Sequence, residues 1–136
     1  MRVLHVLNGM HAGGIQSFLA TVHNHINRDR IQFDYLVRYA DIGLFEPMVK
    51  ELGGDVFHVP HTIKHPRAGA ERMRDFFSKR SYHIAHFHYG FLQNMMPIRI
   101  ARDFGIPMRI MHAHSADYKW RGVRERLFQA NHAINK

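Results

Sequence analysis

The stretch MRVLHVLNGMHAGG, residues 1–14, decides the fold of this chain. It opens with an apolar run over residues 3–7 that is typical of a buried strand, and it closes with Gly13 and Gly14. Residues 15–26 then have helical character. A strand, a glycine turn and a helix in this order predict an anion-binding corner, because the first N–H groups of a helix lack partners and glycine lets a ligand approach closely. A plain strand-to-helix connection is the alternative.

Beyond this corner, strand-like and helix-like segments alternate. The expected strands cover residues 2–8, 32–38, 55–59, 83–88 and 108–113, and the expected helices cover 14–26, 44–52, 68–80, 91–104 and 121–134. The alternation predicts an α/β fold, a doubly wound parallel sheet with helices on both faces and the strand order 3-2-1-4-5. Ligands of such sheets lie beyond the carboxyl ends of the strands, where the winding reverses between the first and fourth strands.

Composition limits the classes of function. The 136 residues indicate a single domain, 1–136, and 46% hydrophobic residues with ten phenylalanines exclude a disordered chain. Cysteine is absent, which excludes disulfides and thiolate chemistry and fits a cytoplasmic location. No apolar run is long enough for a membrane span, and polar residues interrupt the N-terminus, so no signal peptide is expected. The net charge of +8 favours an anionic partner.

Two His-x-His pairs end neighbouring strands of the expected sheet. His88 and His114 stand at or past the strand ends, so we expect them to be exposed and functional. His86 and His112 lie inside apolar segments and are expected to be hydrogen-bonded core residues. A metal site is the alternative, although Asp117 is the one carboxylate beside the pairs.

The remaining histidines receive simpler interpretations. His5 is in the middle of the first strand and is expected to be structural, whereas His11 lies in the glycine loop and is placed to touch a ligand. We expect four others at the surface: His23, His25, His61 and His65.

Five segments together resemble the N-terminal domain of a GT-B glycosyltransferase. They are VLHVLNGMHAGGIQSFL (3–19), IQFDYLV (31–37), ELGGDVFHVP (51–60), HIAHFHYG (83–90) and IPMRIMHAHS (106–115). Their order and spacing are similar to those of family 4, a family of retaining enzymes that includes capsular and exopolysaccharide transferases. The resemblance implies a Rossmann-like, acceptor-side domain of an enzyme that moves a sugar from a nucleotide-sugar donor to a saccharide or lipid-linked acceptor.

The resemblance also assigns roles to individual residues. It implies that Gly13 and Gly14 approach the diphosphate of the donor, and that His114 is catalytic and faces the reacting sugar. His88 is placed near the acceptor. The other acceptor-binding candidates are His11, Gln16 and Ser115. Relatives often have glutamate where this chain has Gln16, which leaves the role of that side chain open. No metal or other cofactor is expected.

The chain departs from the family pattern in one larger respect. GT-B enzymes have a second Rossmann-like domain that binds most of the donor and carries two glutamates eight positions apart. The glutamates here are Glu46, Glu51, Glu71 and Glu125, and no two have that spacing. We therefore expect an incomplete first domain that is inactive alone and whose missing partner is the C-terminal domain.

Basic residues suggest a further contact. They gather in the expected helix 68–80, with Arg72, Arg74, Lys79 and Arg80, and again over residues 119–126. One interpretation is a patch that rests on the anionic inner face of a membrane, where lipid-linked acceptors are found. The other is a solvated helix face.

Two rival functions remain open. A dinucleotide-binding domain expects G-x-G-x-x-G, which the spacing of Gly9, Gly13 and Gly14 does not fit. A basic binding module without catalysis is suggested by the charge alone. The chain has no recognisable motif for reading nucleic acid, so no nucleic-acid partner is expected.

Overall fold

The computed structural model describes residues 1–60, 65–89 and 95–114. Its elements are β1 (Arg2–Leu7), α1 (Gly14–His25), β2 (Gln32–Val37), α2 (Glu46–Glu51), β3 (Val56–His58), α3 (Pro66–Ser78), β4 (Ile84–Tyr89), α4 (Met96–Asp103) and β5 (Met108–Ala113). The expected helix 121–134, the second basic segment, and the residues Ser115, Asp117 and His61 lie outside the described residues.

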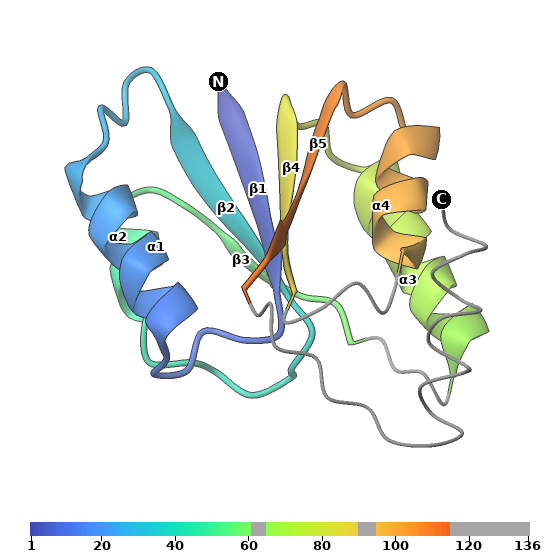
Figure 1. The fold of residues 1–136 in the computed structure, drawn as a ribbon, viewed down its shortest axis with the longest axis horizontal. Helices are drawn as coiled ribbons and strands as arrows, with labels where there is room; N and C mark the ends of the chain where they lie inside the picture. The colour runs from blue at the N-terminus through green and yellow to red at the C-terminus, as the bar shows by residue number, and fades with distance from the viewer. Residues whose placement is uncertain (61–64, 90–94, 115–136) are drawn as a thin grey trace.

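The five strands form one parallel sheet in the order β3-β2-β1-β4-β5, which confirms the α/β, Rossmann-like prediction and its strand order. Figure 1 shows the strands of this sheet running the same way, with their carboxyl ends at the lower edge of the sheet. β1 takes the centre because residues 3–7 are all buried, as a strand covered on both faces requires.

Helices cover the two faces of the sheet (Figure 1). On one face α1 and α2 pack against β1 and β2 through a cluster that includes Leu19, Val49 and Phe33. On the other face α3 and α4 pack through Met73 and Ile100. β5 is the outer strand opposite β3, and five of its six residues are exposed. The sheet is therefore well covered at its centre and more open at β5.

The bounds of α1, α2 and α3 lie within two residues of the expected ones, whereas α4 begins at Met96 rather than at residue 91, with residues 91–94 outside the described part of the chain. α3 begins at Pro66 rather than at residue 68, because proline suits the first turn of a helix, where its missing N–H has no partner to lose. Gly53 and Gly105 follow the ends of α2 and α4 with φ of 82° and 75°, the left-handed conformation that stops helices. Among the described residues, no helix is long and apolar enough to cross a membrane.

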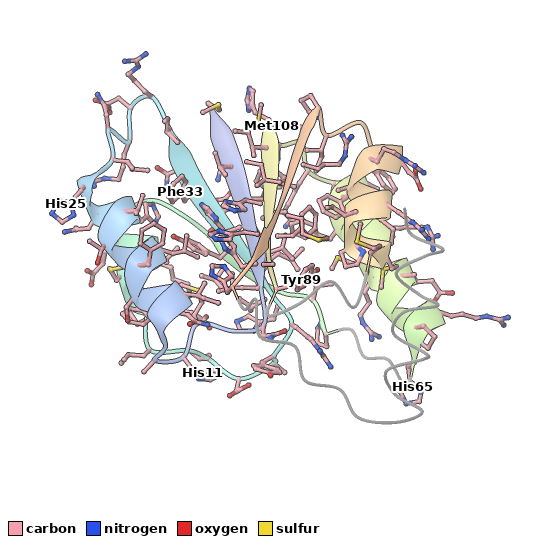
Figure 2. The ribbon with its side chains drawn as sticks, viewed as in Figure 1. His11, His25, Phe33, His65, Tyr89 and Met108 are labelled. Atoms are coloured by element: carbon pink, nitrogen blue, oxygen red, sulfur yellow. The ribbon has the colours of Figure 1, made fainter. Side chains whose placement is uncertain are left out.

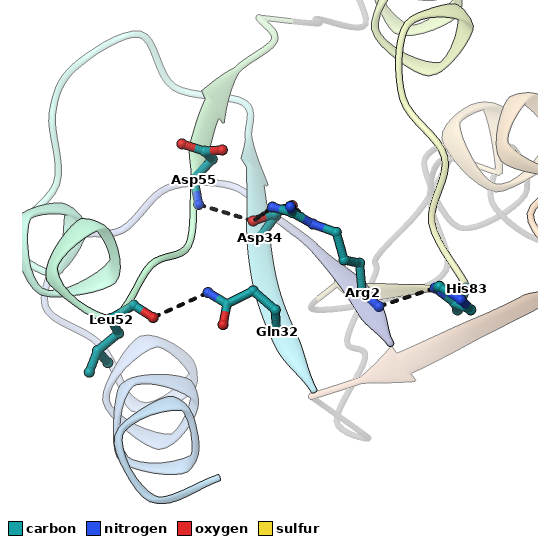
Figure 3. A network of polar contacts seen from close by, with 6 residues as sticks. All are labelled: Arg2, Gln32, Asp34, Leu52, Asp55 and His83. Carbon is teal, nitrogen blue, oxygen red and sulfur yellow. Dashed lines mark hydrogen bonds and ion pairs between the residues drawn. The ribbon is translucent and has the colours of Figure 1, made fainter. Parts of the chain in front are cut away.

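A polar network holds the amino ends of the strands, at the edge away from the glycine loop (Figure 3). The buried carboxylate of Asp34 accepts hydrogen bonds from Nε of Arg2 at 3.0 Å, from Nη2 of Arg2 at 2.7 Å and from the backbone N–H of Asp55 at 3.0 Å. The N–H of Arg2 donates to Nδ1 of His83 at 3.1 Å, which ties β1 to the start of β4. Since every contact is internal, this network stabilises the sheet.

Candidate functional site

The loop that follows β1 is held by its neighbours. The amide Nε2 of Gln16 donates to the carbonyl of Gly9 at 2.8 Å, and the N–H of Phe45 donates to the carbonyl of Met10 at 3.2 Å. Met10 is fully buried. A Cβ on Gly43 would lie 2.3 Å from the carbonyl carbon of Met10, so only glycine fits there. The loop is therefore a fixed backbone surface at the carboxyl edge.

The contacts of Gln16 show what an amide does at this position. Its Nε2 is a donor, and the Gly9 carbonyl that faces it is an acceptor. An ionised glutamate at this position has no proton to donate and could not form this hydrogen bond. The amide accordingly braces the loop. Its role in binding an acceptor remains a prediction.

The two glycines of the corner differ in what surrounds them. A Cβ on Gly13 would lie 2.6 Å from Oε1 of Gln16, so glycine leaves room for that amide. A Cβ on Gly14 would have no atom within 4 Å. Gly14 is exposed and is the first residue of α1, whose start has no side-chain cap and no acidic residue in its first turn. The open space and the uncapped N–H groups suit an anion.

Five histidines line one face of β1, β4 and β5, and we call them the histidine row: His5, His86, His88, His112 and His114. Strand pairing sets His5 beside His86 and His88 beside His112. His114 lies two residues beyond His112 on the same face. His5 shares its face of β1 with Val3 and Leu7, which pack with Leu19 of α1, so this face is on the side of α1. His5 near the start of the described chain and His114 at its end thus belong to the same face of the sheet.

Hydrogen bonds link three rings of the row. Nδ1 of His5 lies 2.9 Å from Nε2 of His88, and Nδ1 of His88 lies 2.9 Å from Nε2 of His114. A neutral imidazole carries one N–H, so His88 donates to one neighbour and accepts from the other. The two hydrogen bonds therefore run in the same direction along the chain of rings. They connect a half-exposed ring, His114, to a buried one, His5.

The burial of these rings corrects two expectations. His88 is 3% exposed, not solvent-facing, because β4 extends to Tyr89 and lies between β1 and β5. His112 is exposed rather than part of the core, because it sits on the outer strand β5 while α1 and α2 pack over β1 and β2. His86 is half-buried and its Nε2 has no hydrogen-bond partner, so the expected hydrogen-bonded core role holds only in part.

His23 was expected at the surface, and that prediction is wrong. Its side chain is fully buried, with Nδ1 3.3 Å from the hydroxyl of Tyr35 on β2. His23 follows Leu19 by four residues, so the two share the face of α1 that meets the sheet. His25 is exposed as predicted, and Figure 2 shows it on the outer side of α1, pointing away from the sheet.

The surroundings of the row favour neutral rings. Burial, with smaller contributions from the nearby His86 and His23, lowers the pKa of His5 to about 3. Burial likewise lowers the pKa of His88 to about 2, with contributions from His86 and His5. The pKa of His114 is lowered by burial and then by His112. These rings are therefore neutral at pH 7 and serve as hydrogen-bond donors and acceptors without charge.

His11 and its surroundings form a second part of the carboxyl edge. Nε2 of His11 lies 3.0 Å from a carboxylate oxygen of Asp41, and both side chains are accessible to solvent. The structure thus brings His88 and His114 into direct contact and leaves His11 in the glycine loop. Gly13 and Gly14 follow β1, which neighbours β4, so the loop and the row share an edge of the sheet.

Within residues 1–60, 65–89 and 95–114, two sets of three histidines have ring nitrogens close enough to share a metal ion. They are His5, His86 and His88, and His88, His112 and His114, with ligand atoms within 4.8 Å of one another in each set. His88 belongs to both sets. The absence of a metal from the transfer reaction, expected from the family, stays a prediction.

A pocket of about 600 Å³ lies elsewhere, against β3 and α3, lined in part by Phe57, Phe76 and Arg80. The guanidinium of Arg80 stacks on both rings, at 4.2 Å from the centroid of Phe57 and 4.9 Å from that of Phe76. β3 is the opposite edge of the sheet from β5. This pocket is separate from the glycine loop and the histidine row, but Arg72 and Arg80 of the basic group in α3 and at its end line it.

The sheet order and the glycine corner define a Rossmann-like α/β domain. No family model matches the chain. It is 28% identical over 120 residues, 87% of its length, to a Bacillus subtilis (strain 168) protein named "Putative glycosyltransferase EpsF". The chain spans about a third of that protein, 31% of its length. This similarity supports glycosyltransferase as the general class to which the chain is related.

Proposed function

We propose that this chain is the acceptor-side, N-terminal domain of a retaining GT-B glycosyltransferase of family 4. The observation that carries the proposal is the similarity to a glycosyltransferase across 87% of the chain, on a parallel sheet with the expected order. The complete protein would move a hexosyl group from a nucleotide-sugar donor to a saccharide or lipid-linked acceptor, as in capsular or exopolysaccharide synthesis. Its work would be cytoplasmic.

The proposed chemistry uses the carboxyl edge of the sheet. The oxygen of an acceptor hydroxyl forms a bond to the anomeric carbon on the face from which the nucleoside diphosphate leaves, which retains the configuration. The bond between the anomeric carbon and the diphosphate oxygen breaks, and the hydroxyl proton passes to the leaving diphosphate as its negative charge grows. The uncapped start of α1 supports that charge through its free N–H groups and its dipole, with no metal ion required. Open space at Gly14 allows the diphosphate to approach the backbone.

His114 is the catalytic residue in this proposal. It hydrogen-bonds the reacting sugar, and its Nε2 contact with Nδ1 of His88 fixes the orientation of the ring. His88 is buried, so it acts on the acceptor side by positioning His114 and by limiting water near the sugar. His11 and Gln16 border the acceptor from the glycine loop, and Ser115 follows His114 directly in the sequence.

The test uses the gene product that contains this chain, assayed with a panel of nucleotide-activated hexoses. We expect His114→Ala to lower turnover at least tenfold, on the order of 1.4 kcal/mol or more of transition-state stabilisation. His25→Ala, an exposed histidine of α1, is the matched control and should leave turnover unchanged. Turnover of His114→Ala within about twofold of wild type would contradict the role given to His114.

The glycine corner has its own test. Gly14→Ala adds a methyl group in open space and has no positive φ to oppose it, so the fold should keep its stability. The same methyl group would obstruct a diphosphate at the start of α1, so the Michaelis constant for the donor should rise several-fold. An unchanged constant would remove Gly14 from the donor site.

Contact with an anionic membrane is a weaker part of the proposal. Three basic side chains of α3 and its end have partners within the chain: Lys79 pairs with Asp75, Arg72 donates to the Pro60 carbonyl, and Arg80 stacks on Phe57. Binding to anionic vesicles that weakens with added salt would support an electrostatic patch. Absence of binding at low salt would leave α3 as a solvated face.

A further inference from the structure

We propose that the outer end of the histidine row, formed by His88, His112 and His114, binds one divalent transition-metal ion of the zinc class. The three rings present ligand nitrogens within 4.8 Å of one another. This inference goes beyond the proposed function, because it depends on the geometry of three side chains and on no step of sugar transfer.

The spacing of the ring nitrogens suits such an ion. Nδ1 of His88 and Nε2 of His114 lie 2.9 Å apart. Two imidazole ligands of a tetrahedral zinc ion, each about 2.0–2.1 Å from the metal, have nitrogens about 3.4 Å apart. An outward shift of about half an ångström would therefore exchange the hydrogen bond for two coordination bonds. The ring of His112 stacks on that of His114 with centroids 4.0 Å apart, so His112 is close enough to be the third ligand.

The scaffold of the site is rigid. β4 and β5 are paired along their full length, with His88 opposite His112, so the backbone of all three ligands belongs to one hydrogen-bonded ladder or its immediate end. The N–H of His114 continues that ladder by donating to the carbonyl of Tyr89 at 3.0 Å. Ligands held on paired strands keep their geometry better than ligands on loops.

The ligand set selects the kind of metal. Three neutral imidazoles with no carboxylate among them suit zinc, cobalt, nickel or copper, whereas magnesium and calcium require oxygen ligands. Three protein ligands leave a fourth position for water or another small ligand. His112 is exposed, which gives an ion a path from solvent. The inner set, His5, His86 and His88, has its members more deeply buried.

His5 supports the outer site as a positioning residue. A metal on Nδ1 of His88 leaves the ring proton of His88 on Nε2, which lies 2.9 Å from Nδ1 of His5. His88 then donates to His5, and this hydrogen bond fixes the orientation of the ligand ring, as partners of metal-bound histidines commonly do. Of the two directions open to the hydrogen bonds of His88, metal binding thus selects the one in which His88 donates from Nε2 to Nδ1 of His5.

The experiment titrates cobalt(II) into the untagged 136-residue chain after treatment with a chelator, in the absence of any sugar nucleotide. We expect one ion per chain, intense visible absorption bands typical of tetrahedral cobalt, and displacement by zinc(II) but not by magnesium(II). Weak, pale bands typical of octahedral cobalt, or binding without saturation, would overturn the proposal. The result is independent of transferase activity, so failure here and failure of the proposed function can be told apart.

Variants locate the ion. His112→Ala changes an exposed side chain and should weaken cobalt binding at least about tenfold, with loss of the tetrahedral bands. His114→Ala should have the same effect, and circular dichroism checks that both variants fold. His25→Ala, an exposed histidine outside the row, is the control and should bind as wild type does. Wild-type binding by folded His112→Ala, or loss of binding in His25→Ala, would place the ion elsewhere and overturn the proposal.

Discussion

The histidine row and the pair formed by His58 and Glu46 show how the same side chain takes opposite roles in one small domain. In the row, rings face other rings, and burial holds His5 and His88 neutral. At the other side of the sheet, Nε2 of His58 lies 3.1 Å from a carboxylate oxygen of the buried Glu46. Its Nδ1 lies 2.6 Å from the carbonyl of Tyr39. Both partners of His58 are acceptors.

The difference teaches that neighbours, rather than residue type, set the charge of a histidine here. Burial alone would lower the pKa of His58, but the hydrogen bonds to the Tyr39 carbonyl and to Glu46 raise it overall. The other oxygen of Glu46 accepts from the backbone N–H of Gly43 at 2.7 Å. His58 therefore belongs to a charged structural contact that also steadies the loop against Met10, whereas the buried rings His5 and His88 are neutral.

The largest expected effect is a loss of unfolding free energy at acidic pH, caused by the buried rings of the histidine row. Below pH 6.5 the unfolded chain protonates His5 and His88, but the folded chain does not until about pH 3 and about pH 2. Stability therefore falls as pH decreases through this window, by about 1.4 kcal/mol per group for each pH unit. Urea unfolding at pH 6.5 and pH 5.5 should differ by about 2 kcal/mol, because each ring of the unfolded chain is already half protonated at pH 6.5.

Replacing one ring of the row tests whether these histidines cause the change of unfolding free energy with pH. His5→Phe removes one proton-binding group and should reduce the dependence of unfolding free energy on pH by roughly half of the two-ring contribution. The slope, not the absolute stability, is the readout, because the change also leaves Nε2 of His88 without its partner. His25→Ala should retain the wild-type slope. An equal slope in His5→Phe and wild type would show that the row is not its source.

The next largest effect is expected from Glu46→Gln. The amide removes the negative charge beside His58 while keeping an acceptor for the N–H of Gly43, so the unfolding free energy should fall by about 1–2 kcal/mol at pH 6. The pKa of His58, followed by NMR, should move down toward its ordinary value. A pKa that stays raised would mean that the Tyr39 carbonyl alone accounts for the shift.

His58→Gln tests the pH window of the same contact. The raised pKa of His58 means that its contribution is fully present below pH 6.5 and is lost as pH rises through the folded-state value. Wild type should therefore exceed the variant in stability by about 0.5–1 kcal/mol at pH 6, and the gap should narrow above neutrality. A gap that widens with rising pH would contradict a cationic His58.

The smallest effect is expected from His112→Ala when no metal is present. His112 is exposed on the outer strand, so its loss should change the unfolding free energy by less than about 0.5 kcal/mol. The same substitution is expected to change metal affinity strongly. Thermal unfolding measured with and without zinc(II) separates the two: zinc should stabilise wild type more than the variant.

Local sequence signals predicted most of the fold. The apolar run of residues 3–7 and the glycines at 53 and 105 are short-range features, and each acts on the backbone within a few residues. Pro66 at the start of α3 is another such signal, but the expected helix 68–80 left it outside. The contact between His88 and His114 was also within reach, because the expected order sets β4 beside β5. The four-residue spacing of Leu19 and His23 was a signal for the buried ring that the sequence interpretation missed.

The surroundings of each histidine lay beyond the sequence. His5 meets His88 across 83 positions, and Glu46 meets His58 only because β3 pairs with β2 and α2 packs beside it. Periodicity along the chain determines which segments become strands and helices, since backbone conformation responds to near neighbours. Burial, charge state and ligand geometry depend on the side chains that packing brings from distant segments. In this domain these side chains lower the pKa of His5 and His88 and raise that of His58.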